Sequence, residues 1–433
     1  MITVVIDDDP TGTQAMSDVP VILDWGDETA WATVAPGERA VHVLTNSRAF
    51  PGAAAGALVA SAAAAARSRF PDSRVVLRGD STLRAHVWEE YAALRSVLAP
   101  GREGLPLMLV PALPAAGRVT IDGVHLLERD GERIPLDETE YARDGELAYT
   151  TSVLSRWAQE RSGGRLPASE AIGVGLAALR GPNDDGASAV MAAIVTAAQL
   201  THPVVVVPDA EDEHDLEVIA DGLRKAEAAG VQVIVRCAPA FVAALTGAGA
   251  TGTVSLPAGA ASALVICGSF VPATTAQIAA VEARWPDVLV PASVTELAGE
   301  RSTAEVRHVA QEAQSRIEDH GVAVVVTDRT RDPAHVAASS QQRIATALAQ
   351  VARAVSADVV IAKGGITSAV TAREGMGAHA ARVLGPVKPG VSLWRLADGR
   401  DFVVVPGNVG GPELLVELLM PIMSPAVDAG LVW

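Results

Sequence analysis

The sequence predicts an α/β protein of two domains, each a mostly parallel sheet flanked by helices, with a β-hairpin excursion in the N-terminal domain. The length of 433 residues exceeds what one hydrophobic core usually covers, so two domains are expected. Hydrophobic residues make up 49% of the chain and aromatic residues only 3%, which indicates cores packed from Ala, Val and Leu. Short apolar runs alternate with longer helical stretches, and this alternation is typical of parallel βαβ units.

The first predicted strand, residues 3–6, leads directly into three consecutive aspartates at positions 7–9. Carboxylates this close repel one another, and proteins usually retain them where a metal, a bound hydroxyl or a cation offsets the repulsion. Open α/β sheets also bind their ligands beyond the carboxyl ends of the strands. The alternative interpretation is a solvated acidic turn shaped by Pro10 and Gly12.

A second polar strand exit lies at residues 78–86, where Ser81 or Thr82 is predicted to cap a helix. An arginine near a helix N-terminus opposes the helix dipole, so Arg84 suggests a residue that is held there for an anionic ligand. The alternative is a surface arginine paired with Asp80 or Glu89. The strands predicted around this exit are 40–45, 74–78 and 105–110, and the helices are 52–68 and 83–98.

Between residues 111 and 144, prolines and glycines break the chain into short alternating pieces, which predicts the β-hairpin excursion. Arg118 and the segment 141–144 are polar points on it that could close over a site. The βα rhythm resumes over 151–235. Residues 247–252 match a dinucleotide-binding glycine spacing, but they follow a helical stretch instead of a strand, so this match is rejected. The predicted organisation is an N-terminal domain at 1–245, a linker at 246–261 and a C-terminal domain at 262–433.

Three glycine or serine turns follow strands in the C-terminal half, at 267–269, 363–368 and 406–411. A strand, a glycine turn and a helix start leave a concave set of free backbone N–H groups, which suits a phosphate. The helix starts are assigned to Thr274 or Thr275 and to Thr367 or Ser368 as caps. Three such turns on one sheet predict a single polyphosphate site, whereas one turn alone is also an ordinary βα connection.

The net charge of −17 argues against nucleic acid and anionic membranes as partners, because both require clustered Lys and Arg. The two cysteines, Cys237 and Cys267, form neither a disulfide framework nor a zinc pattern, as is typical of a reducing cytosol. The N-terminus turns acidic within seven residues, which does not fit a signal peptide, and no apolar run has the length to span a bilayer. We therefore expect a cytoplasmic protein.

Two reaction classes fit a carboxylate-bearing half and a phosphate-binding half. One is a phosphotransferase, with an acceptor hydroxyl beside a carboxylate base and ATP in the other domain. The other is a haloacid-dehalogenase-type phosphatase with Asp7 as nucleophile and Asp9 as acid/base, although that class needs a later acidic pair and only 184–185 offers one. A non-catalytic small-molecule-binding protein is the third alternative.

The chain resembles the four-carbon acid sugar kinase family over nearly its whole length. The family's motifs are an acidic pair followed by x-Thr-Gly, then Asp-Ser-Thr-Leu-Arg-Gly, Pro-x-x-Gly-Arg, Ala-Arg-Asp, Ser-Gly-Ser, Gly-Gly-x-Thr-Ser and Gly-Asn-x-Gly-Gly. They are matched in this order at 8–12, 80–84, 114–118, 142–144, 267–269, 364–368 and 407–411. Ala85 replaces one glycine of the pattern, and Ile366 stands where the family usually has an acid, which removes a contact to ribose or metal.

The resemblance implies an ATP- and Mg²⁺-dependent kinase that phosphorylates the terminal hydroxyl of threonate, erythronate or 3-oxo-tetronate in a cleft between the domains, and a homodimer is compatible with it. Asp8 or Asp9 would accept the hydroxyl proton or help position Mg²⁺. Arg84 and Arg118 would hold the substrate carboxylate bidentately. The other expected substrate-binding residues are Thr11, Asp80 and Asp144, and the expected ATP-binding residues are Ser269, Gly364, Gly365, Ile366, Thr367, Ser368, Gly407 and Asn408.

Overall fold

The computed structural model describes residues 1–181, 185–257, 259–328 and 338–423. The chain forms two compact units: unit 1 comprises Met1–Val19 and Val34–Ala250, and unit 2 comprises Pro20–Thr33 and Thr251–Trp433. The segment Pro20–Thr33, which the sequence analysis placed in the N-terminal domain, thus packs in unit 2. There β2 (Val19–Ile22) lies beside β16 (Ala380–Lys388), and the N–H groups of Leu23 and Asp24 both donate to the carbonyl of His379.

Unit 1 is built on a parallel sheet whose strands end at one edge. In the register, Asp7 lies opposite both Leu44 and Arg78, and Cys237 lies opposite both Arg78 and Val110. The polar residues that follow these strands are therefore brought to the same edge. The strand order is β3 (Ala40–Leu44), β1 (Thr3–Asp7), β4 (Arg74–Arg78), β11 (Ile234–Cys237), β5 (Leu107–Val110), β10 (Val205–Pro208) and β9 (Ile172–Val174).

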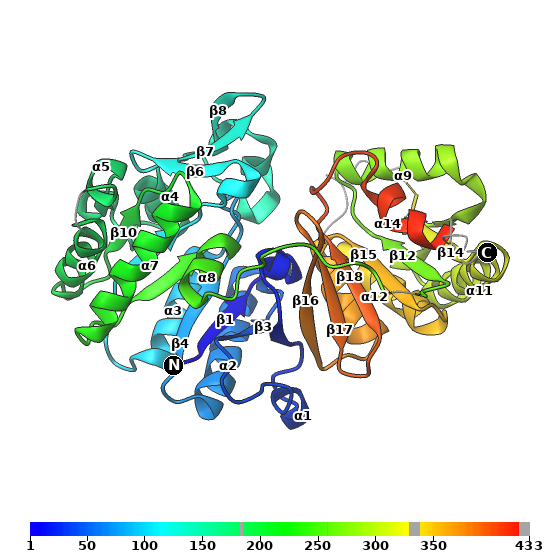
Figure 1. Cartoon of the computed structure of the whole chain (residues 1–433), viewed down its shortest axis with the longest axis horizontal. Coiled ribbons are helices and arrows are strands. Elements are labelled where there is room, and N and C mark those ends of the chain that lie inside the picture. The colour runs from blue at the N-terminus through cyan, green and yellow to red at the C-terminus, as the bar shows by residue number, and fades with distance from the viewer. Residues whose placement is uncertain (182–184, 258, 329–337, 424–433) are drawn as a thin grey trace, which may run out of the picture. The chain divides into compact units, whose positions relative to one another are not determined.

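Helices cover both faces of this sheet (Figure 1). α2 (Gly52–Arg69) and α3 (Val87–Leu98) lead the chain one way along the sheet, and α6 (Asp185–Ala198) and α7 (Glu213–Ala228) lead it back. Because parallel crossovers are right-handed, the two pairs lie on opposite faces. α2 and α3 pack closely, since a Cβ on Gly56 would lie only 3.1 Å from the carbonyl oxygen of Glu89. The remaining helices of unit 1 are α4 (Leu154–Arg161), α5 (Leu176–Leu179) and α8 (Pro239–Thr246).

The predicted β-hairpin excursion is confirmed, as a three-stranded antiparallel sheet of β6 (Arg118–Ile121), β7 (Val124–Arg129) and β8 (Glu132–Pro135). The first turn has positive φ at both Asp122 and Gly123, the conformation that tight hairpins favour. Both oxygens of Asp209, after β10, accept the N–H groups of this turn, at 2.8 and 2.9 Å. These bonds fix the excursion against the carboxyl edge of the sheet.

Unit 2 contains a second mostly parallel sheet. Cys267, Lys363 and Val405 lie opposite one another in register, so the turns that follow them begin at the same level. The order is β13 (Leu289–Ala292), β14 (Val322–Thr327), β12 (Ala263–Cys267), β15 (Val359–Lys363) and β18 (Asp401–Val405), followed by the antiparallel β17 (Val391–Leu396), then β16 and β2. The sequence analysis did not identify β16 and β17.

Alternate residues of β12 and β15 pack with Ile278 and Val281 of α9 (Pro272–Arg284) and with the apolar side of α14 (Leu414–Met423), which forms one core of unit 2. Figure 1 shows these two helices together near β12. None of the described helices has the length and apolar character to cross a membrane. The other helices of unit 2 are α1 (Glu28–Trp31), α10 (Val294–Ala298), α11 (Ser302–His320), α12 (Ala338–Ala354) and α13 (Gly365–Val370).

The predicted helix caps are wrong, because the hydroxyl groups bond elsewhere. α13 begins after Gly364, and Ser368 donates backwards to the carbonyls of Ala362 and Gly364. α9 begins after Val271, and α3 begins after His86, with no cap from Ser81 or Thr82. The Ser368 hydroxyl thus bonds to the turn that precedes α13 and does not cap the helix.

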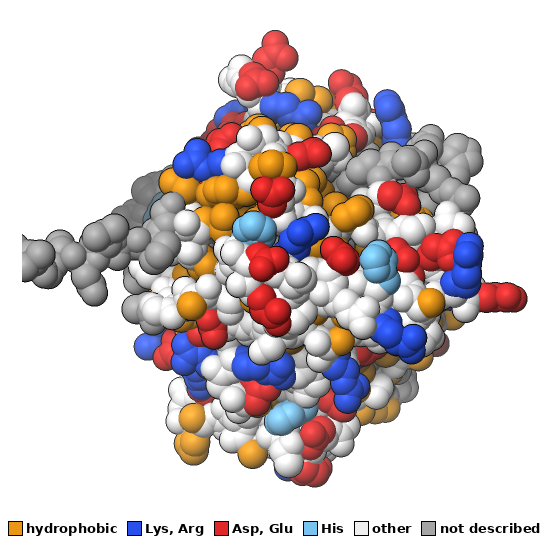
Figure 2. All heavy atoms as spheres, turned by 90° about the vertical axis from the view of Figure 1, so that its right-hand side faces the viewer, with side chains coloured by type: hydrophobic (Ala, Val, Ile, Leu, Met, Phe, Trp, Pro, Cys, Tyr) orange, Lys and Arg blue, Asp and Glu red, His pale blue; other side chains and the backbone are white. Residues whose placement is uncertain are grey.

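The face at the right of Figure 1 carries charges of both signs. Figure 2 shows its described Lys and Arg side chains interspersed with Asp and Glu instead of gathered into one basic patch.

Candidate functional site

The first aspartate of the acidic run is a buried structural anchor. Asp7 is 1% exposed, its Oδ2 lies 2.9 Å from Nδ1 of the buried His42, and its Oδ1 lies 3.1 Å from Nε of Arg78. The chain passes directly over this pair, since a Cβ on Gly12 would lie 2.2–2.4 Å from Arg78 and from both oxygens of Asp7. Asp7 is therefore enclosed by protein.

The second aspartate faces three arginines. Oδ1 of Asp8 accepts from Arg48 Nη2 at 2.8 Å and from Arg78 Nη1 at 2.6 Å, and Oδ2 lies 3.7 Å from Arg236 Nη2. Burial alone would raise the pKa of the Asp8 carboxyl. The three guanidinium charges outweigh burial and hold this pKa below its usual value. Asp8 is therefore charged, and it holds the guanidinium groups of Arg48 and Arg78 in place.

The third aspartate is the most open of the run. Asp9 caps the 3₁₀ helix Pro10–Ala15, its Oδ1 accepting the N–H of Thr11 at 2.6 Å. Its Oδ2 lies 3.5 Å from Arg48, and the side chain is 13% exposed, compared with 3% for Asp8. Thr11 also lies at the site, where its hydroxyl accepts from Arg78 at 3.3 Å. Asp9 is thus the aspartate of the run whose carboxylate is most exposed.

None of the three arginines that bind this run was among the predicted site residues. Arg78 ends β4, and Arg236 lies on β11, where it pairs with the buried Glu90 of α3. Arg78 and Arg236 are charged residues at or next to the carboxyl ends of their strands, beside the aspartates. The signal that could have found them is the position of an arginine at a strand's carboxyl end, where side chains of neighbouring parallel strands meet.

The predicted residues Asp80, Arg84, Arg118 and Asp144 also come together. Arg84 donates to Asp80 at 2.6 Å and to Asp144 at 3.0 Å. The guanidinium carbons of Arg84 and Arg118 lie 5.7 and 6.0 Å from the ring centroid of Tyr141, so both arginines flank one aromatic ring. Tyr141 was noted in the sequence only as part of a polar segment.

The Asp80 carboxylate is buried, which would raise its pKa, but Arg84, Arg48 and the Thr82 hydrogen bond hold that pKa far below its ordinary value. The turn around it is tightly held, because Tyr149 donates to the carbonyl of Thr82 at 2.8 Å. Leu83 has a φ of 67° in this turn, a conformation that costs a non-glycine residue energy and that occurs most often at functional sites.

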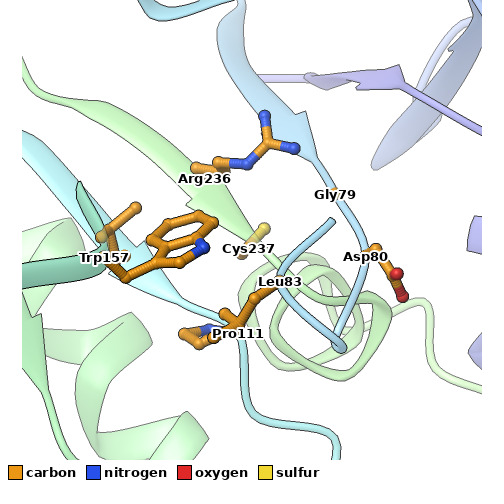
Figure 3. A pocket seen from close by; sticks show the side chains of 8 residues that line it. Gly79, Asp80, Leu83, Pro111, Trp157, Arg236 and Cys237 are labelled. Atoms are coloured by element: carbon orange, nitrogen blue, oxygen red, sulfur yellow. The ribbon is translucent and has the colours of Figure 1, made fainter. Parts of the chain in front are cut away.

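A small pocket lies beside this turn, at the ends of β4, β5 and β11 (Figure 3). Arg236, Trp157 and Cys237 line it, with Gly79 and Leu83 on the other side. Among the described residues, Nε1 of Trp157 and Nη2 of Arg236 are buried without a hydrogen-bond partner. The pocket has room for about one water molecule, so it fits a single oxygen atom and not a whole sugar acid.

In unit 2 the three predicted turns converge. A Cβ on Gly407 would lie 2.7 Å from the hydroxyl of Ser269, and a Cβ on Gly364 would lie 3.1 Å from the Cβ of Ser269. A Cβ on Gly268 would lie 2.5 Å from the hydroxyl of Thr367. Gly364 has a φ of 111°, which an L side chain rarely adopts. These glycines are needed for close approach of the turns.

The remaining predicted nucleotide residues divide by exposure. Thr367 and Ser368 are buried in the first turns of α13, and Gly365 and Ile366 are half-buried beside them. Ile366 packs against the small apolar cluster of Ala345, Ala349 and Val370. Asn408 is exposed on the turn after β18. Ile366 supplies no oxygen for a metal or a ribose.

Comparisons with known proteins agree with the division of the chain into two domains. The sequence matches the family description of a sugar-binding N-terminal domain over residues 3–245 and that of a nucleotide-binding C-terminal domain over residues 264–415. No curated protein matches the chain.

Two solved structures share the fold. One is a Salmonella typhimurium LT2 protein proposed to be a tRNA synthase, 21% identical, with a TM-score of 0.70 over 96% of this chain and 98% of that one. The other is Haemophilus influenzae protein HI1011, of the family DUF1537, 18% identical, with a TM-score of 0.62 over 97% of this chain and 100% of that one. The paired domain matches show that the chain belongs to the four-carbon acid sugar kinase family.

Proposed function

We propose that the protein is an ATP-dependent kinase that phosphorylates the terminal hydroxyl of a four-carbon sugar acid. The observation that carries the proposal is the convergence of the turns at Ser269, Gly364 and Gly407 within the domain matched to nucleotide binding. Unit 1 supplies the complementary chemistry, a carboxylate and arginine cluster at a sheet edge of the sugar-binding domain. The transferred phosphoryl group must pass from one ligand to the other, so the reaction needs both domains.

The contacts of Asp8 and Asp9 support different roles for these two candidate catalytic residues. Asp8 is surrounded by arginines that stabilise its charged form, which makes it a poor proton acceptor. Asp9 has one oxygen committed to the N–H of Thr11, and its other oxygen lies 3.5 Å from Arg48 in a side chain that is 13% exposed. We assign the general base to Asp9, which accepts the proton of the attacking hydroxyl, and assign to Asp8 the placement of Arg48 and Arg78.

The substrate carboxylate is assigned to the pair of arginines on Tyr141. Arg118 carries a buried Nε without a hydrogen-bond partner among the described residues, and Arg84 keeps part of its donor fork free beyond its bonds to Asp80 and Asp144. A planar guanidinium binds a carboxylate through two parallel N–H bonds.

Mg²⁺ would be held mainly by the nucleotide phosphates and water, as is usual for this ion. The described residues contain no cluster of three His, Cys, Asp or Glu side chains that could hold a metal on their own. When bound, Mg²⁺ neutralises charge that develops on the phosphate oxygens.

The phosphatase alternative fits the geometry poorly. Its nucleophile, Asp7, is held between His42 and Arg78 beneath Gly12, so its oxygens do not reach a substrate. The acidic pair at 184–185 includes residue 184, which lies outside the described residues. A phosphate monoester would therefore lack an attacking group at this strand end.

The proposal is tested by measuring ATP consumption over a panel of D- and L-threonate, D- and L-erythronate and 3-oxo-tetronate acids. ADP formation with one or more of them is expected. No ADP above background with any acid would reject the substrate class, and phosphate release from sugar phosphates without ATP would instead favour a phosphatase.

Replacing Arg118 with Lys tests the carboxylate assignment. Lys keeps the charge but loses the fork, so we expect the KM for the sugar acid to rise about tenfold while the KM for ATP is unchanged. Arg129→Lys, on β7 of the same small sheet, is the matched control because Arg129 forms its ion pair with the exposed Glu140. An unchanged KM for the acid in Arg118→Lys would remove Arg118 from the site.

A further inference from the structure

The turn after β18, residues 406–411, has nearly all of its carbonyl groups directed toward buried side chains. Lys363 Nζ donates to the carbonyls of Pro406 and Val409, at 2.6 and 3.2 Å. Gln277 Nε2 donates to the carbonyls of residues 409, 410 and 411, at 3.0–3.1 Å. Thr274 donates to the carbonyl of Gly407 at 3.0 Å. All three donor residues are fully buried.

This arrangement determines where the N–H groups of the turn point. In a trans peptide the carbonyl of one residue and the N–H of the next point in opposite directions. Because the carbonyls of 406, 407, 409 and 410 face the three side chains, the N–H groups of residues 407, 408, 410 and 411 face away from them. None of these four N–H groups donates to a described residue. Four aligned free donors form an anion-binding concavity.

We propose that Lys363, Gln277 and Thr274 are positioning residues that hold this turn with its N–H groups directed at the nucleotide phosphates. The inference rests on the proposed function, in which unit 2 binds ATP. It also gives a role to the lysine that precedes the glycine turn in the sequence. Lys363 acts on the backbone of the neighbouring turn, and its ammonium group does not contact a phosphate, because Nζ is enclosed by Pro406 and Val409.

The charge of Lys363 gives the inference a pH signature. Burial lowers the pKa of its ammonium group to about 8, and the titratable group beside it is the thiol of Cys267 on β12. The folded-state pKa lies below the ordinary lysine value of 10.5, so folding favours the neutral amine. This residue therefore makes the fold more stable as the pH rises from about 8 toward 10.5, whereas its charge-assisted bonds to the turn weaken over the start of that range.

The test compares Thr274→Val, which keeps the shape and removes the donor, with Thr274→Ser, which keeps the hydroxyl. Calorimetric titration with ATP and ADP is expected to show about tenfold weaker binding for Thr274→Val, and binding near wild type for Thr274→Ser. Lys363→Met is expected to weaken nucleotide binding at pH 7, because the carbonyl of Pro406 loses its buried donor and the turn is held less firmly. Sugar-acid affinity stays unchanged in all three.

The matched control is Gln314→Leu on α11, which removes a glutamine that accepts from the N–H of Ser356, distant in sequence from the turn. It should leave the Kd for nucleotide unchanged. Wild-type protein that binds neither ATP nor ADP overturns the proposed function and this role with it. Wild-type binding that persists unchanged in Thr274→Val and Lys363→Met overturns the positioning role alone. Nucleotide affinity that falls only in proportion to a lowered melting temperature would also overturn it, because it would indicate a purely structural effect.

Discussion

Replacing Asp9 with Asn is expected to lower kcat by about 10²–10⁴ while the Kd for ATP changes by less than twofold. Asn has the size of Asp, and its side-chain oxygen still accepts the N–H of Thr11, so the cap of the 3₁₀ helix is kept. The substitution removes the negative charge and the basicity of the Asp9 carboxylate. Steady-state kinetics and calorimetric titration of ATP measure the two effects separately.

The control for the capping effect is Asp27→Asn. Asp27 caps α1 in the same way, its carboxylate accepting the N–H of Thr29, and lies in unit 2. It should leave kcat unchanged. A kcat for Asp9→Asn within about threefold of wild type would transfer the base to another group, and a large loss of ATP affinity would place Asp9 at the nucleotide instead of the sugar acid.

Gly12→Ala should be the most destabilising single change at the site. Its Cβ would lie within 2.4 Å of Arg78 Nε and both oxygens of Asp7, and these groups are buried with no room to move aside. Separating a buried ion pair typically costs about 3–5 kcal/mol, so the free energy of unfolding of unit 1 is expected to fall by about that amount. Chemical denaturation followed by the change in tryptophan fluorescence measures it.

Gly173→Ala in the edge strand β9 is the matched control, because its nearest neighbour is 4.0 Å from the new Cβ. It should shift the midpoint little. If Gly12→Ala unfolds at the wild-type midpoint and still binds sugar acids, the close packing of Gly12 over Asp7 and Arg78 does not matter to the site.

Much of the fold followed from local patterns in the sequence. The β-branched runs ending at Asp7, Arg78 and Lys363 predicted strands because buried parallel strands have few alternatives, and prolines and glycines that break the chain into short pieces predicted the hairpin excursion. The antiparallel strands β16 and β17 were missed because their pairing depends on partners on the same sheet, with a register shift at Gly385 that interrupts their alternation.

Part of the candidate site was predictable because its residues follow strands directly. Asp8, Asp9 and the glycine turns were found by position alone. Arg48 and Arg236 come from segments distant in sequence, and their contact with Asp8 depends on strand order, which one sequence does not reveal. The predicted cap at Thr274 failed for a related reason, since its hydroxyl donates to the carbonyl of Gly407, which lies on the turn after another strand.

The placement of Pro20–Thr33 in unit 2 has a consequence for synthesis on the ribosome. The strand β2 is made among the first residues of the chain, but its partner β16 is made near the end. At about 5–20 residues per second, β2 and the apolar side of α1 are synthesised tens of seconds before β16. During that time Ala30 and Trp31, buried in the finished protein, remain uncovered. Nascent chains of this protein therefore carry a strand with one unpaired edge, which is a natural point for chaperone binding and for misassociation between chains.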